Sequence, residues 1–163
     1  MSSAAPRLSA LQRDHATLMR VLLHRVGETR ALATAWRRGE ASVVLRSLAD
    51  RATVAVAADV LGALAGGGLA AAGSGGDVLP TVAPVISELL ASDYEDTVSA
   101  GVRSLAAALA LTREGSSSGG DALLLLAQPL RYAIARLPAS SALAAPAATC
   151  LAQLAALAAA APP

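Results

Sequence analysis

The sequence contains no lysine and no phenylalanine, and aromatic residues of any kind are rare. Trp36, Tyr94 and Tyr132 are the only aromatic side chains among 163 residues. Strand-forming residues are scarce outside short valine runs. Alanine alone supplies nearly half of the 55% of residues that are hydrophobic, and alanine is the best helix former. This composition predicts an all-α chain of closely packed helices rich in alanine and leucine.

Cysteine is almost absent too, because Cys150 is the only one. An internal disulfide is therefore excluded, and a buried free thiol on an alanine-rich helix is expected. The first fifteen residues lack the apolar core of a secretory signal. The tail from Ala139 to Ala161 is apolar, but Pro146 and Gln153 interrupt it. We therefore expect no membrane-spanning helix and no membrane partner.

Charge is distributed unevenly along the chain, although the net charge is only +1. Residues 1–59 hold nine arginines against five acids, whereas residues 60–163 hold four arginines against seven acids. The exclusive use of arginine is explained by a GC-rich genome, by its forked contacts with carboxylates, or by both. The asymmetry indicates that the N-terminal part faces an anionic partner.

The spacing of apolar residues predicts a single helical domain over residues 9–160. A long first helix begins near Ser9 or Asp14 and ends at Gly39. Glycine- and serine-rich stretches at 66–76 and 115–120 predict two flexible loops. The fold expected is an irregular array of about seven helices, armadillo/HEAT-like or solenoid-like. The later helices are expected at 40–49, at 51–65 capped by Asp50, at 77–91 capped by Asp77, from the cap Asp93 through Leu109, at 121–137 with a disturbance at Pro129, and at 139–160.

The first helix has an apolar seam along one side. At 100° per residue, leucines and Trp36 align on this side, and Arg25 joins them. A charge in this position is costly unless it is paired or reaches solvent. The seam is therefore predicted to be in part a protein interface, with internal pairing of Arg25 as the alternative. The predicted partner-binding residues are Leu18, Leu22, Arg25, Leu32 and Trp36.

Five arginines form a cationic face on the same helix. Arg13, Arg20 and Arg38 project almost opposite the seam, and Arg30 and Arg37 lie together on one flank. A solvated helix face is the alternative to a binding role. Nucleic acid is a rival partner, but the modest net charge, the lack of stacking aromatics and the acidic second half argue against it.

Catalytic chemistry is not apparent in the sequence. His15 and His24 lie about 180° apart on the first helix, so they cannot share a metal ion. His15 is expected in the interior, on the apolar side. Asp93, Glu95 and Asp96 suit a helix start better than a cation site. With no phosphate-binding loop and no nucleophile elbow, we expect neither an enzyme nor a metal or cofactor site.

Three segments together resemble the conserved C-terminal domain of the WD-repeat-bearing regulatory subunit of katanin. They are HATLMRVLLHRVGETRALATAWRRGEASVVLRSLADRATVAVAADVLGAL, PTVAPVISELLASDYEDTVSAGVRSLAAALAL and LLLLAQPLRYAIARLP through LAQLAAL. The resemblance extends roughly from Asp14 to Leu157 and is clearest up to Ala110. Arginine and alanine replace the lysine and larger apolar residues of many relatives. The WD-repeat propeller is absent, so we expect a domain of a larger protein.

The resemblance implies a non-catalytic regulatory and targeting role in microtubule severing. Its implied partners are the N-terminal helical domain of katanin's AAA ATPase subunit, tubulin in microtubules, and spindle-pole or minus-end targeting proteins. The implied location is the cytoplasm and cytoskeleton, at microtubules, the spindle pole or centrosome, or the ciliary axoneme. Tubulin's surface is acidic, so the five arginines are the expected microtubule contacts. A helical-repeat scaffold with an unrelated partner and a nucleic-acid-binding module are the alternatives.

Overall fold

A computed structural model describes residues 4–50, 52–71, 78–113, 120–138 and 140–160, and all regular elements in these ranges are helices. The all-α prediction is confirmed. Two of the described helices, α4 (Gly68–Ala71) and α7 (Gly120–Leu124), are about one turn long. The seven longer ones are α1 (Ala4–Arg37), α2 (Ala41–Asp50), α3 (Val54–Leu64), α5 (Val78–Ala91), α6 (Glu95–Arg113), α8 (Ala127–Arg136) and α9 (Ala144–Ala160).

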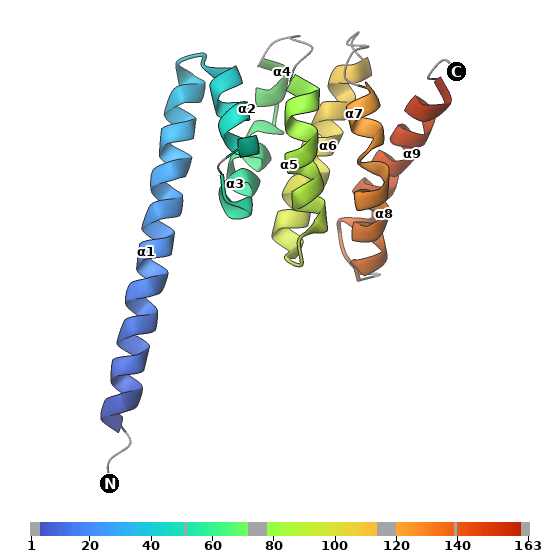
Figure 1. The fold of residues 1–163 in the computed structure, drawn as a ribbon. Helices are drawn as coiled ribbons and strands as arrows, with labels where there is room; N and C mark the ends of the chain where they lie inside the picture. The colour runs from blue at the N-terminus through green and yellow to red at the C-terminus, as the bar shows by residue number, and fades with distance from the viewer. Residues whose placement is uncertain (1–3, 51, 72–77, 114–119, 139, 161–163) are drawn as a thin grey trace.

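The helices stand side by side in two rows (Figure 1). Helices α2, α5 and α8 contact one another in sequence and form one row, and α3, α6 and α9 form the other. Contacts of α5 with α6 and of α8 with α9 join the rows, and α1 packs against α2 and α3 at one end. Stacked helix pairs would give such rows, but the armadillo/HEAT-like or solenoid-like character stays a prediction.

Helix α1 is longer than expected, because it begins at Ala4 rather than at Ser9 or Asp14. Residues 4–8 include two alanines, which favour a helix, and a proline in the first turn is tolerated. Its end is the predicted one. Gly39 has a φ of +82°, its N–H donates to the Trp36 carbonyl at 2.9 Å, and the Glu40 N–H donates to the Ala35 carbonyl at 3.1 Å. This pair of bonds is a Schellman cap.

The start of α3 differs from the prediction that Asp50 caps it. Asp50 is the last residue of α2, and Thr53 caps α3 by accepting a hydrogen bond from the Val56 N–H at 3.4 Å. Thr53 is in the extended conformation that a capping residue requires, so its hydroxyl takes this role. The predicted inward residues of these two helices are confirmed as buried: Val44, Leu45, Leu48, Val56, Val60, Leu61 and Leu64.

Helix α6 begins at Glu95, and its first turn contains Glu95 and Asp96. Negative charges at a helix N-terminus interact favourably with the helix dipole. Asp93, predicted to cap this helix, instead pairs with Arg136 of α8. The apolar stripes predicted for α5 and α6 are confirmed as buried. Their members are Leu79, Val82, Ile86, Leu89 and Leu90 on α5, and Val98, Val102, Leu105 and Leu109 on α6.

Proline positions explain where the later helices begin. Pro80, Pro129 and Pro146 are each the third residue of a helix, where no helical carbonyl is available to the missing N–H. The chain is therefore interrupted before Pro129, between α7 and α8, rather than at it. Pro84 alone of the described prolines lies in the interior of a helix, and its side chain is exposed.

The two glycine-rich segments lie only partly within the described residues. Residues 72–76 and 115–119 of the predicted loops fall outside them. In the described remainder, Gly68–Ala71 is the short helix α4, and Leu69 is only 1% exposed in the core. This leucine is the apolar residue that turns part of the expected loop into a packed element. No helix within the described ranges has the length and apolarity needed to cross a lipid bilayer.

Candidate docking surface

The N-terminal part of α1 projects beyond the rest of the molecule (Figure 1). We call residues 11–24 the arm, because nearly all of this stretch is exposed. Further along the same helix, Leu32, Ala35 and Trp36 are partly buried and pack against the core. Helix α1 is therefore supported by the body only through its C-terminal part.

The apolar seam of α1 is covered in one half and open in the other. By helical spacing, Leu11, Leu18 and Leu22 lie on the same side of α1 as Leu32 and Trp36. Leu11 is 66% exposed, Leu18 56% and Leu22 42%. The side that packs on α2 and α3 thus continues along the arm with nothing in the described structure covering it.

The structure consequently divides the predicted partner-binding residues into two groups. Leu18 and Leu22 are on the open arm, whereas Leu32 and Trp36 contact the core of this chain while keeping part of their surface exposed. Arg25 lies between the groups. From residue 11 onward, it is the first residue of α1 that is partly buried.

Arg25 forms a bidentate ion pair with Asp59 of α3. This is the internal pairing that the sequence analysis gave as the alternative to an interface role for Arg25. Arg25 Nε donates to Oδ2 at 2.6 Å and its Nη2 donates to Oδ1 at 2.6 Å. The hydrogen bonds to Asp59 raise the pKa of Arg25. The two side chains are 40% and 39% exposed, so the pair is worth little in stability. Its geometry nevertheless fixes α1 to α3 where the arm begins.

Asp59 was not identified from the sequence as a functional residue. The available signal was its place as the only charged residue in the apolar helix 54–64. A carboxylate in that position needs a cation, and Arg25 was the cation with an unexplained place on an apolar seam.

The five arginines of the cationic face are all exposed on or just after α1. Arg37 bonds to its own helix, with Nε donating to the Ala33 carbonyl at 3.2 Å and Nη2 donating to the Thr34 hydroxyl at 3.3 Å. Among the described residues, no ion pair joins Arg20, Arg30 or Arg38 to an acid. Since these arginines lie opposite or beside the seam, the two faces of α1 are available to different partners.

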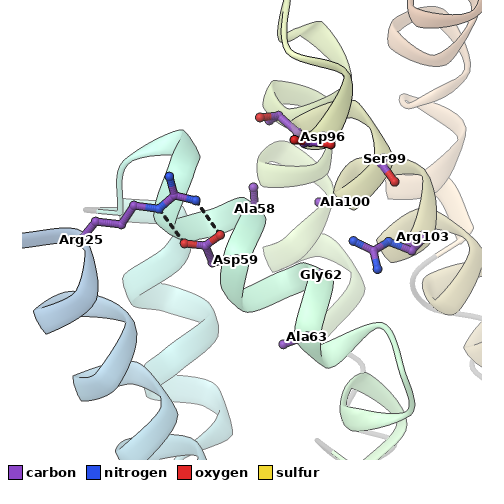
Figure 2. A pocket seen from close by; sticks show the side chains of 10 residues that line it. Arg25, Ala58, Asp59, Gly62, Ala63, Asp96, Ser99, Ala100 and Arg103 are labelled. Carbon is purple, nitrogen blue, oxygen red and sulfur yellow. Dashed lines mark hydrogen bonds and ion pairs between the residues drawn. The ribbon is translucent and has the colours of Figure 1, made fainter. Parts of the chain in front are cut away.

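A groove lies where α1, α3 and α6 meet (Figure 2). Its volume is about 440 Å³, and the Arg25–Asp59 pair lies at its α1 side. Helix α3 contributes small residues, and α6 contributes polar and charged ones, including Asp96 and Arg103. The sequence did not reveal this groove, because three helices from distant parts of the chain form it.

Among the described residues, the histidines, the acids and the cysteine do not form a recognisable catalytic or metal-binding site. His15 is exposed on the arm, so the expectation of an interior imidazole is wrong, because the body does not extend to cover this part of α1. His24 Nε2 lies 3.4 Å from Glu28 Oε1. In the part of the chain that the structure describes, no three His, Cys, Asp or Glu side chains gather to hold a metal ion. Burial raises the pKa of the Cys150 thiol, which disfavours the nucleophilic thiolate.

The fold and this surface define an all-helical domain with an amphipathic helix left open on its apolar side. The family model for the con80 domain of katanin matches residues 13–111, and the chain therefore belongs to that family. The matched region runs from the arm into α6. No curated protein and no solved structure matches the chain.

Family membership gives the chain a katanin-associated regulatory role, because the con80 domain is part of katanin's regulatory subunit. It also associates the chain with the cytoskeleton. Helices α7, α8 and α9 lie beyond the matched region but pack against α5 and α6. They therefore extend the two rows that the family region begins.

Proposed function

We propose that this domain binds the N-terminal helical domain of katanin's ATPase subunit through the open seam of the arm. One observation supports this proposal. The apolar side of α1 packs against the core at Leu32 and Trp36, but the same side is uncovered at Leu18 and Leu22. Exposed apolar surface of this kind on a folded domain indicates a protein-binding site. An amphipathic partner helix is the natural occupant, since it covers an apolar stripe with its own.

The proposal is tested with the double substitution Leu18→Asp and Leu22→Asp. Both side chains are exposed, so the fold should survive. Replacing two apolar side chains with charged ones at the centre of an interface should weaken binding about tenfold or more. Isothermal titration calorimetry with the purified ATPase N-terminal domain measures this change. The control is Leu125→Asp, which alters another leucine that is 77% exposed.

Trp36→Ala is less decisive as a test, because Trp36 also packs against the core of this chain. A loss of binding in that variant would combine interface and folding effects. If the two arm substitutions leave the affinity unchanged while circular dichroism shows native helicity, the seam is not the docking surface.

We propose further that the cationic face of α1 assists binding to microtubules, in support of severing at spindle-pole or minus-end sites. The arginines lie away from the seam, so the ATPase subunit and an acidic surface can bind α1 together. Attraction between exposed charges is screened by salt, so this contribution should fall as ionic strength rises.

Arg37→Glu combined with Arg38→Glu should lower co-sedimentation of the ATPase–regulatory heterodimer with microtubules, most clearly at low salt. Arg131→Glu is the control, since Arg131 is exposed on α8, far along the chain. An unchanged pellet fraction at low salt would show that these two arginines do not contribute to microtubule binding. Fluorescence titration with DNA and RNA at two salt concentrations separates microtubule binding from general polyanion binding.

A further inference from the structure

The open seam and the groove meet at Arg25. Leu18 and Leu22 precede Arg25 by seven and three residues, which places all three on one side of α1. Arg25 also lines the groove, together with its partner Asp59 (Figure 2). A molecule lying on the seam therefore reaches the groove without leaving the surface.

The floor of the groove consists of small residues. On α3 it is formed by Ala58, Gly62 and Ala63. Helices pack with axes about 8–10 Å apart, and the closest approaches need small side chains at the contact. The far wall is α6, where Asp96 and Arg103 are labelled in Figure 2.

The groove carries two charges that the chain does not neutralise. Among the described residues, no ion pair involves Asp96 or Arg103. The guanidinium of Arg103 lies over the floor, since a Cβ added to Gly62 would be 3.3 Å from Arg103 Nη2. Asp96 and Arg103 are seven residues apart on α6, which corresponds to about 10 Å along the helix axis. Arg25 and Asp59 neutralise each other.

We propose that the arm's seam and this groove form one continuous track for a single amphipathic helix of the ATPase subunit's N-terminal domain. This inference rests on the proposed function and specifies the partner's chemistry. The occupying helix presents apolar residues to Leu18 and Leu22, a cation to Asp96, and a carboxylate about two turns further on to Arg103. Charge complementarity at the groove fixes the register that an apolar seam alone leaves open.

The length of the track suits one helix. From Leu11 to Arg25 the seam extends about 21 Å, at a rise of about 1.5 Å per residue. Helix α2 runs opposite to α1, and α3 then runs in the same direction as α1 (Figure 1). The stretch of α3 from Asp59 to Ala63 therefore adds about 6 Å to the track. Together they accommodate a helix of about 18 residues, which is within the ordinary range for globular domains.

The track is tested by filling the groove and by reversing the charge of one of its arginines. Ala63 lines the groove and is exposed, so Ala63→Trp should block the groove without disturbing the core. Ala106 is exposed on α6 and does not line the groove, so Ala106→Trp is the matched control. Arg103→Glu reverses the charge of one side chain in the groove, and Arg131→Glu makes the same change on α8.

Calorimetric titration with the purified ATPase N-terminal domain should show binding weakened about tenfold by Ala63→Trp and by Arg103→Glu. The two controls should stay within about twofold of the unchanged chain, and circular dichroism should show equal helicity throughout. The charge effect should diminish at high salt, while the effect of the tryptophan should persist.

The outcomes separate the two proposals. If the unchanged chain does not bind the ATPase domain, the proposed function fails. If Leu18→Asp with Leu22→Asp weakens binding but neither groove variant does, the function holds and the track is wrong. The track is also wrong if the groove variants and the arm variant all bind as the unchanged chain does, because the partner then lies elsewhere.

Discussion

Ser104 and Gly101 are two small buried residues of α6. Ser104 is the only buried polar residue in the described part of the chain, with 0% of its surface exposed, and its Oγ has no hydrogen-bond partner there. One turn earlier, Gly101 lies so near α5 that an added Cβ would be 3.0 Å from the Cβ of Leu89. A small residue is required at Gly101, where α6 meets α5, and the buried Ser104 hydroxyl costs stability because it is unpaired.

Ser104→Ala should therefore raise the free energy of unfolding by about 1 kcal/mol, because an unpaired buried hydroxyl is removed. Urea denaturation followed by circular dichroism measures the change. Ser99→Ala, at a partly exposed position on the same helix, should have little effect. A clear loss of stability in Ser104→Ala would mean that the hydroxyl has a partner in solution.

At the scale of elements, α5 is the central helix of its row and carries a proline in its interior. It contacts α2, α3, α6, α7 and α8. Pro84 has no N–H to donate to the Pro80 carbonyl one turn earlier, and the ring crowds that carbonyl. Tertiary packing on the buried side of α5 holds the helix together despite this defect.

Pro84→Ala should raise the free energy of unfolding by about 2 kcal/mol, because it restores a helical hydrogen bond and removes the crowding. Pro129→Ala should change it by less than about 1 kcal/mol, since Pro129 is at a position where the N–H has no helical partner. Equal effects of the two substitutions in urea denaturation would refute this distinction.

At the scale of the whole molecule, α1 belongs to the body at one end and projects from it at the other. An isolated helix about as long as the arm is only marginally stable in water, so the arm depends on its connection to the body and on a partner. Most arginines are in the first 59 residues and most acids follow them. Helix α1 therefore carries both the uncovered apolar side and four of the five arginines of the cationic face, and Arg38 follows directly after it.

Hydrogen–deuterium exchange should be fast in residues 11–22 and slow in residues 29–37 of the free chain, because only the latter pack on the body. The ATPase N-terminal domain should slow exchange in the arm. At a free concentration of 100 times its Kd, it should also stabilise the fold by about 2.7 kcal/mol. Protection confined to other helices would contradict docking on the arm.

Much of the helical layout was predictable from local patterns. The apolar stripes of α2, α3, α5 and α6 follow the 3.6-residue period, and the residues named from that period are buried. The cap of α3 was not predicted correctly, since Asp50 and Thr53 are both good capping residues and only the backbone conformation distinguishes them. Leu69 was assigned to a loop because the surrounding glycines conceal its burial against the core.

The sequence alone determined that α1 has an apolar side and an arginine side, because the helical period assigns each residue to a face whatever surrounds the helix. Only the tertiary structure decided how far the body covers that apolar side. It also placed Asp59, 34 residues away along the chain, against Arg25. Contacts between distant segments depend on how all the helices pack together, and no local pattern specifies where that packing stops along α1.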